Sequence, residues 1–164
     1  MKQIIAQGTF TEYINDDGWE YIARKNNRKV VSIIAYTDNN ELILVKQFRK
    51  PINKYVIEFP AGIIDEGETP QQAALRELKE ETGFNGIVRN VEGPFTKSAG
   101  ITNEETYIVY ITALNQTQQN LQDDEKIEII KVGLDTSDNP CKLLNKNIIL
   151  DSNVAMIVSV LDSK

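Results

Sequence analysis

Hydrophobic and polar residues alternate along much of the chain, as they do in β-strands that bury one face. The alternation is clearest near the beginning, where the segments 29–36 and 41–48 are joined by the turn-rich sequence TDNN. Later apolar segments continue the pattern. Strands are therefore predicted for seven segments: 20–24, 29–36, 41–48, 55–59, 86–91, 106–112 and 126–132.

Two other segments have the residue spacing of amphipathic helices. In the first, residues 69–82, Thr69 is the expected N-cap, Pro70 occupies the first helical position, and Gly83 follows the end. The second is the tail from 141 to 162, where apolar residues recur every three or four positions. The pattern predicts an α/β (α+β) fold, with a mixed sheet flanked by two helices.

The composition is typical of one soluble globular domain, and we expect that domain to span residues 1–164. Hydrophobic residues make up 41% of the chain and charged residues 26%. No apolar run approaches the roughly 18 residues that a membrane span requires, and the first residues lack the apolar run of a signal peptide. The single cysteine, Cys141, requires no oxidising compartment, so a cytoplasmic location is expected.

The charge of the chain narrows the possible chemistry. A net charge of −6 without a long basic cluster argues against nucleic-acid binding. The chain has no histidine, which excludes nucleophiles activated by histidine and the usual zinc ligands. Acid–base chemistry must therefore come from carboxylates, lysine, tyrosine or activated water.

The predicted helix at 69–82 carries an unusual concentration of acidic residues. Glu77 is three and four positions from Glu80 and Glu81, so their like charges repel one another on the helix surface. A solvated helix face, compensated by Arg76 and Lys79, is the ordinary explanation of such a run. A hard cation such as Mg²⁺ would reverse the repulsion, because it binds carboxylate and phosphate oxygens.

The spacing of the surrounding residues decides between these interpretations. Seven positions in this window, from Gly62 to Gly83, match a fixed pattern that random sequence would meet on the order of once in 10⁸ starts. The pattern is glycine, five residues, glutamate, seven residues, then Arg-Glu-aliphatic-x-Glu-Glu-x-Gly and an apolar residue. The chain thus resembles the Nudix family. The seven residues are Gly62, Glu68, Arg76, Glu77, Glu80, Glu81 and Gly83.

The resemblance implies a Nudix fold, an α/β/α sandwich around a mixed sheet, and Mg²⁺-dependent hydrolysis of nucleoside diphosphate derivatives, with Mn²⁺ as an alternative ion. It also implies that the metal ligands are Glu77, Glu80 and Glu81, with the Ala61 carbonyl as a backbone ligand. Glu68 and Arg76 resemble the ion pair that orients the helix and its preceding loop.

Residues 44–84 are also similar, over their full length, to the ADP-sugar pyrophosphatase branch of this family, whose members cleave ADP-ribose to AMP and ribose 5-phosphate. The upstream sequence GWEYIARK resembles the adenine-binding segment of that branch. The resemblance implies these substrate-binding residues: Trp19 as the adenine platform, Glu20 as a base-edge partner, and Arg24 and Arg49 near the ribose and diphosphate. The branch usually has Ser-Pro-Gly where this chain has Ser98-Ala99-Gly100, and this leaves the exact sugar open.

The residues themselves leave two of these assignments open. A single tryptophan is more often a core residue, although Trp19 lies in a polar run that would expose it. Arg49 follows an apolar strand and is suited to a bidentate phosphate contact, but an ion pair with Glu58 explains it equally well. Glu58 is therefore counted with Arg49 among the expected substrate-binding residues.

A general base for hydrolysis is expected among the carboxylates. In similar enzymes a glutamate in a loop before a late strand has this role, which points here to Glu125, with Glu80 among the box glutamates and Glu104 as the next candidate. A solvated acidic turn at 123–125 is the alternative for the first of these.

Two other functions stay open at this point. The first is a Nudix hydrolase acting on another nucleoside diphosphate derivative or on a nucleoside triphosphate. The second is a sensor that binds ADP-ribose without cleaving it, which the intact glutamate pattern disfavours. The resemblance also implies a homodimer in which the N-terminal strand segment, residues 1–28, swaps onto the partner and helps to bind adenine.

Overall fold

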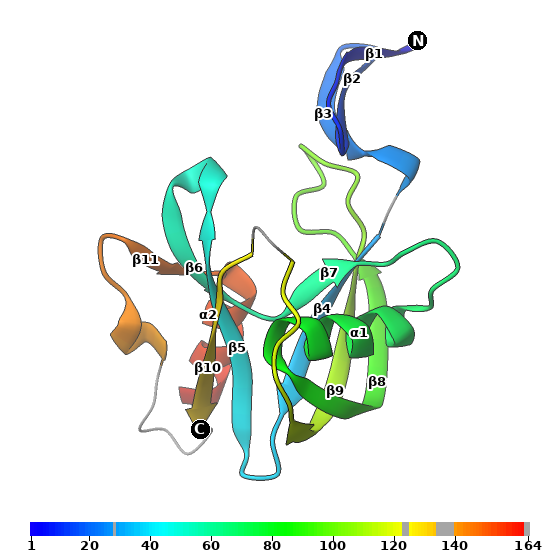
Figure 1. The fold of residues 1–164 in the computed structure, drawn as a ribbon. Coiled ribbons are helices and arrows are strands. Elements are labelled where there is room, and N and C mark those ends of the chain that lie inside the picture. The colour runs from blue at the N-terminus through cyan, green and yellow to red at the C-terminus, as the bar shows by residue number, and fades with distance from the viewer. Residues whose placement is uncertain (28, 123–124, 134–139, 163–164) are drawn as a thin grey trace.

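The structure, a computed structural model, describes residues 1–27, 29–122, 125–133 and 140–162. Its eleven described strands form a small N-terminal sheet and a larger main sheet, and its two α-helices pack on the latter (Figure 1). The small sheet contains β1 (Lys2–Gln7), β2 (Thr11–Asp16) and β3 (Trp19–Arg24). The main sheet contains β4 (Val30–Tyr36), β5 (Glu41–Arg49), β6 (Lys54–Glu58), β7 (Ala61–Ile63), β8 (Phe84–Phe95), β9 (Thr106–Gln116), β10 (Ile127–Gly133) and β11 (Ile148–Leu150).

The main sheet is mixed, as the hydrophobic pattern predicted. Its strands follow the order β11-β6-β5-β4-β9-β8, with β10 paired to β5 and β7 paired to β4. The pairs β4–β9 and β6–β11 are parallel, and the other pairs are antiparallel. All seven predicted strands are present, although β8 and β9 extend several residues further than the sequence indicated.

The helix α1 (Pro70–Thr82) begins and ends where its capping residues predicted. The Thr69 hydroxyl accepts a hydrogen bond from the Gln72 backbone N–H, and the Gln72 side-chain oxygen accepts one from the Thr69 backbone N–H. Gly83 closes the helix with a φ of 74°. Ala73, Ala74 and Leu78 are fully buried against the sheet. Local sequence therefore sets the position of this helix.

The two helices cover opposite faces of the main sheet, which gives the α/β/α arrangement. On β4, Val31 and Ile33 pack in the same cluster as Leu78 of α1, whereas Ile34 packs in the cluster of Val154. Val154 belongs to α2 (Ser152–Asp162). Alternate residues of one strand thus point to the two helices.

The prediction of one helix over residues 141–162 is wrong in its first half. Residues Pro140–Leu143 form a 3₁₀ turn, and Ile148–Leu150 form β11, which pairs with Tyr55–Ile57 of β6. The helix begins only at Ser152, where Asp151 Oδ1 accepts a hydrogen bond from the Asn153 amide at 2.9 Å. At the edge of the sheet, the backbone groups of β6 need hydrogen-bond partners, and residues 148–150 supply them. The spacing of apolar residues in the tail does not show this pairing.

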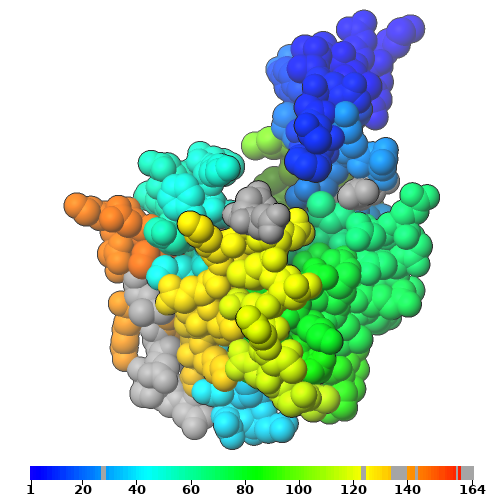
Figure 2. Space-filling model, viewed as in Figure 1, coloured from blue at the N-terminus to red at the C-terminus, as the bar shows by residue number. Residues whose placement is uncertain are grey.

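The small N-terminal sheet stands out from the rest of the molecule (Figures 1 and 2). It contacts the loop after β8, where the Ile22 amide donates to the Ile101 carbonyl at 2.8 Å. Ile4 and Ile5 on this sheet and Phe10 in the turn between β1 and β2 are exposed. In the described part of the chain, no helix is long and apolar enough to cross a membrane.

Candidate active site

The last two turns of α1 bring its acidic residues towards β7. Glu81 is buried, and its Oε2 accepts a hydrogen bond from the Ala61 amide at 3.1 Å. Ala61 also pairs with Ser32, so the end of the helix is tied to the centre of the main sheet. The predicted backbone ligand and one predicted carboxylate ligand are therefore neighbours.

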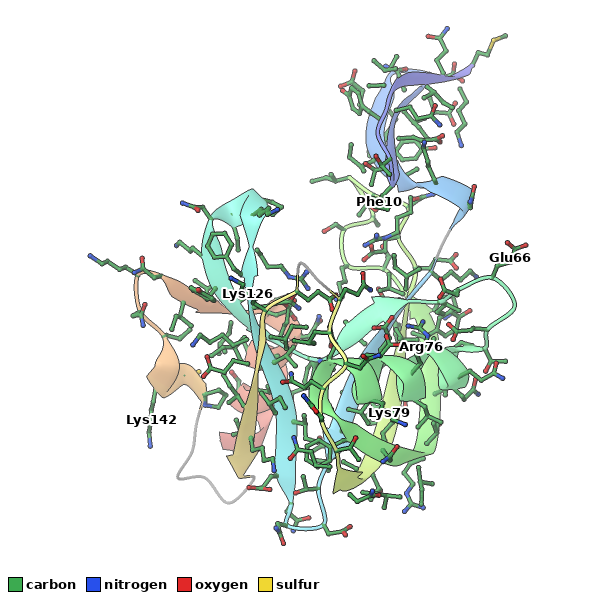
Figure 3. The ribbon with its side chains drawn as sticks, viewed as in Figure 1. Phe10, Glu66, Arg76, Lys79, Lys126 and Lys142 are labelled. Atoms are coloured by element: carbon green, nitrogen blue, oxygen red, sulfur yellow. The ribbon has the colours of Figure 1, made fainter. Side chains whose placement is uncertain are left out.

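Arg76 holds the acidic residues and the loop before the helix together. Its guanidinium makes a bidentate ion pair with Glu68, at 2.9 and 2.8 Å, which is the predicted pairing. It also donates to Glu77 at 2.7 Å, to Glu80 at 3.3 Å, and to the Ile63 carbonyl at 2.9 Å. Arg76 thus lies between α1 and β7 and links both to the loop (Figure 3).

Burial and mutual repulsion raise the pKa values of the two least exposed glutamates. Burial raises the pKa of Glu81 to about 8; the bond from the Ala61 amide opposes this shift, and the charges of Glu77, Glu125 and Glu58 add to it. Burial likewise raises the pKa of Glu77, against the stabilising effect of Arg76. A bound cation would stabilise the ionised form of these two carboxylates, because it supplies the positive charge that a proton otherwise provides.

Gly62 allows the strand β7 to approach α1 closely. A Cβ at this position would lie 1.9 Å from the carboxyl carbon of Glu77. Only glycine leaves room for the Glu77 side chain as it stands. This contact explains the first fixed residue of the sequence pattern.

The donor set fits a hard divalent cation. Three carboxylates and a nearby backbone carbonyl supply only oxygen ligands, and burial raises the pKa values of two of the carboxylates, Glu77 and Glu81. Among the residues that the structure describes, the acidic groups do not converge into a three-ligand site. Arg76 donates to Glu77 and Glu80, and Glu81 accepts from the Ala61 amide, so all three carboxylates are bonded to groups of the protein itself.

Glu125 lies close enough to the acidic end of α1 to influence it. Its charge contributes to the raised pKa values of both Glu77 and Glu81. Its own carboxylate accepts a hydrogen bond from the Gln122 amide at 3.0 Å. Asp123 and Asp124, which complete the alternative acidic turn, lie outside the described residues.

Comparison with known proteins identifies this arrangement. The model of the NUDIX domain matches residues 26–139, more than half of the chain. The chain belongs to the Nudix family. The segment from Gly62 to Gly83 is therefore its Nudix box, and α1 is its Nudix helix.

Named relatives of this Nudix chain include two pyrophosphatases. It is 33% identical over 136 residues to the ADP-ribose pyrophosphatase of Bacillus subtilis, covering 82% of this chain and 72% of that protein. It is 34% identical over 154 residues to the ADP-sugar pyrophosphatase of Mus musculus, covering 80% and 71%. These matches confirm the predicted Nudix hydrolase class and the resemblance to the ADP-sugar branch.

A solved structure supports the fold. A crystal structure of an ADP compounds hydrolase superposes with a TM-score of 0.73 and covers 99% of this chain and 90% of that one. The two sequences are only 18% identical, so this likeness concerns the fold alone.

Sequence reasoning missed the segment that closes the C-terminal end of the Nudix helix. Residues 116–120 supply a donor to four consecutive carbonyls, those of the last three helical residues and of the cap residue Gly83. The bonds are Gln116 Nε2 to Thr82, Thr117 N and Oγ1 to Gly83, Gln119 Nε2 to Glu81, and Asn120 N to Glu80, at 2.5–3.0 Å. Gln119 Nε2 also donates to the Ile127 carbonyl at 3.2 Å, two residues after Glu125. The glutamine-rich composition of this segment was the only signal in the sequence.

The predicted substrate-binding arginines are both engaged in ion pairs. Arg24 Nε lies 2.7 Å from Glu104 Oε2, so two predicted site residues meet each other rather than the box. Arg49 Nε lies 2.8 Å from Glu58 Oε1, which is the ion pair that the sequence left as an alternative. The charge of Glu58 also contributes to the raised pKa of Glu81, so this second pair lies near the box.

Trp19 lies on the N-terminal sheet with 64% of its surface exposed, so it is not a core residue. Its indole Nε1 donates to the Gly100 carbonyl at 3.3 Å. Glu20, the next residue, is exposed and accepts hydrogen bonds from Tyr13 and Asn15. The structure therefore brings Trp19 to the Ser98-Ala99-Gly100 loop. Among the described residues, no hydrogen bond joins Trp19 or Glu20 to the box.

Proposed function

We propose that this Nudix chain hydrolyses the diphosphate bond of ADP-ribose or a related ADP-sugar, giving AMP and a sugar phosphate, with Mg²⁺ as the working ion. The observation that carries the proposal is the group of carboxylates at the end of α1, two of which have raised pKa values through burial and mutual repulsion. The substrate class rests on the names of the relatives.

Each residue has a distinct part in this proposal. Glu77, Glu80, Glu81 and the Ala61 carbonyl would hold the cation, which offsets the diphosphate charge and acidifies a nearby water. Arg76 restrains the box through Glu68. Arg49 binds a phosphate oxygen after it leaves Glu58, and Arg24 lies near the ribose. Trp19 stacks on adenine, and Glu20 accepts from the base edge.

The attacking water must lose a proton as its oxygen bonds to phosphorus and the bridging P–O bond breaks. We assign the proton to Glu125, because its charge acts on two box glutamates whereas Glu104 is paired with Arg24. Glu125→Gln should lower turnover by about 100-fold, the typical contribution of general base catalysis, and leave ADP-ribose affinity unchanged. Equal losses in turnover and affinity, or a greater loss of turnover in Glu104→Gln, would exclude this assignment.

Product analysis tests the function as a whole. ADP-ribose, ADP-glucose and a nucleoside triphosphate are incubated in parallel, with and without Mg²⁺ or Mn²⁺, and AMP, sugar phosphate and pyrophosphate are measured. We expect AMP and sugar phosphate, and only when a divalent ion is present. Pyrophosphate from the triphosphate would indicate another Nudix hydrolase, and tightly bound but intact ADP-ribose would indicate a sensor.

A homodimer and a cytoplasmic setting complete the proposal. The exposed apolar residues on the projecting N-terminal sheet favour a second subunit. The cytoplasm suits a chain whose single cysteine needs no oxidising compartment.

A further inference from the structure

A cavity of about 370 Å³ lies between α2 and the face of the main sheet that is turned away from the Nudix helix. Its walls are mainly apolar. They come from Ile34 and Ile108 in the sheet, from Phe59 directly after β6, from Met156 and Ile157 of α2, and from Phe95 at the end of β8. This volume lies within the range of about 300–1,000 Å³ that is common for small-molecule sites.

A buried hydroxyl group at this cavity has no partner. Thr106 is only 3% exposed, and its Oγ1 makes no hydrogen bond within the described part of the chain. Its side chain points to the cavity side of β9, together with Ile108 two residues later. Buried polar atoms are nearly always hydrogen-bonded. The unpaired hydroxyl of Thr106 is therefore suited to a hydrogen bond with a polar atom of a ligand.

The cavity also has a positive charge at its rim. Lys97 lies on its wall, is exposed, and forms no ion pair among the described residues. The first turn of α2 adds Ser152 and Asn153, but its helix dipole already faces the Asp151 carboxylate. The Lys97 side of the rim is therefore the one that favours an anion.

The cavity is separate from the proposed hydrolytic site. On β4, Val31 and Ile33 pack with the Nudix helix, whereas Ser32 and Ile34 line the cavity. The main sheet thus stands between the box glutamates and this second site.

We propose that the cavity binds a small amphipathic anion. Its apolar body packs between Phe59, Ile108 and Met156, a polar atom of the ligand bonds Thr106 Oγ1, and its anionic group lies at Lys97. The inference does not depend on which substrate the Nudix box cleaves.

Anilinonaphthalene sulfonate is a suitable probe, because it combines an aromatic body, an N–H group and one anionic group, and its fluorescence rises in apolar surroundings. We expect saturable binding to the full chain. Met156→Trp, at a largely exposed helix position, should narrow the mouth and weaken binding at least tenfold, and Lys97→Gln and Thr106→Val should weaken it severalfold. Leu114→Ser, at an exposed position near the end of β9 and outside both the cavity and the N-terminal sheet, is the matched control and should leave binding unchanged.

The stability of Thr106→Val gives a second, independent readout. Replacing an unpartnered buried hydroxyl by a methyl group should raise the melting temperature of the ligand-free protein. A fall in melting temperature would mean that the hydroxyl is already satisfied, and the proposal would then fail. Probe binding that survives Met156→Trp, or is lost in Leu114→Ser, would equally overturn it.

Discussion

At the scale of single residues, the Nudix box depends on one close contact between strand and helix. Gly62 faces the carboxyl group of Glu77 at a distance that excludes any Cβ. Gly8, in contrast, has ordinary space around it, since a Cβ at that position would lie 3.6 Å from its nearest neighbour, the Thr11 carbonyl oxygen. Substituting alanine at each position therefore separates two effects. At Gly62 the added Cβ displaces Glu77, whereas at Gly8 it only reduces the freedom of the backbone.

Gly62→Ala should displace the Glu77 side chain and lower turnover by about 100-fold, the scale expected when a catalytic group moves by about an ångström. Turnover with ADP-ribose and the Mg²⁺ concentration for half-maximal rate are the measurements. Gly8→Ala should match the wild type in both. Wild-type kinetics in Gly62→Ala would show that the position of Glu77 is unimportant.

The Glu68–Arg76 pair is the second feature decided by individual residues. The bond from Arg76 lowers the pKa of Glu68 from its ordinary value of 4.5 to about 2. A carboxylate whose pKa is depressed on folding stabilises the fold above its ordinary pKa and loses that effect as the pH falls towards the folded value.

The pH dependence of unfolding tests this pair. Glu68→Gln should lower the free energy of unfolding relative to wild type at pH 7, and the difference should shrink between about pH 4.5 and 2 as wild-type Glu68 becomes protonated. Urea unfolding at both ends of this range measures it. Glu66→Gln, at the exposed tip of the same loop (Figure 3), is the control and should match wild type throughout. A difference that stays constant with pH would contradict the ion-pair explanation.

At the scale of elements, the Nudix helix is defined at its two ends in different ways. Its N-terminus depends on neighbours in sequence, through the Thr69 capping box. Its C-terminus depends on residues 116–120, more than thirty positions away. Gln119 is the central residue of this second contact, since it bonds both the helix and the strand that follows Glu125.

Gln119→Ala should therefore affect both stability and catalysis. Two partly buried carbonyls lose their donor, which should cost about 1 kcal/mol of unfolding free energy. Turnover should fall about tenfold with little change in KM, because the loop carrying Glu125 loses its tie to the helix. The neighbouring Gln118→Ala, at an exposed position, should change neither quantity. A pure loss of stability with full turnover would limit Gln119 to a structural role.

At the scale of the whole molecule, the N-terminal sheet is the feature that the rest of the fold does not explain. It carries Trp19, whose indole donates to the Gly100 carbonyl, and it exposes the apolar residues Ile4 and Ile5. The sheet projects from the rest of the molecule (Figure 2). A single subunit thus separates the proposed adenine platform from the proposed chemistry. A dimer in which Trp19 serves the partner's site would reunite them.

Mixing two defective variants tests this arrangement. Trp19→Ala should raise KM for ADP-ribose, since stacking on a base contributes about 1–3 kcal/mol, and Glu81→Gln should abolish turnover. If Trp19 serves the neighbouring subunit, unfolding and refolding an equal mixture should restore roughly a quarter of the sites, because half of the dimers are mixed and each has one intact site. Activity no higher than the average of the two parents, or a monomeric mass in solution, would rule the exchange out.

The sequence by itself determined the Nudix helix, its N-terminal cap, the Glu68–Arg76 pair and the positions of seven strands along the chain, because each depends on local spacing or on a fixed pattern of side chains. Only the tertiary structure decided the pairing of Arg24 with Glu104, the closure of the helix by residues 116–120, the strand β11 within the tail, and the cavity behind the sheet. These features join residues that are distant along the chain. The free energy of such contacts depends on how deeply the residues are buried and how closely they approach, and the spacing of apolar residues shows neither.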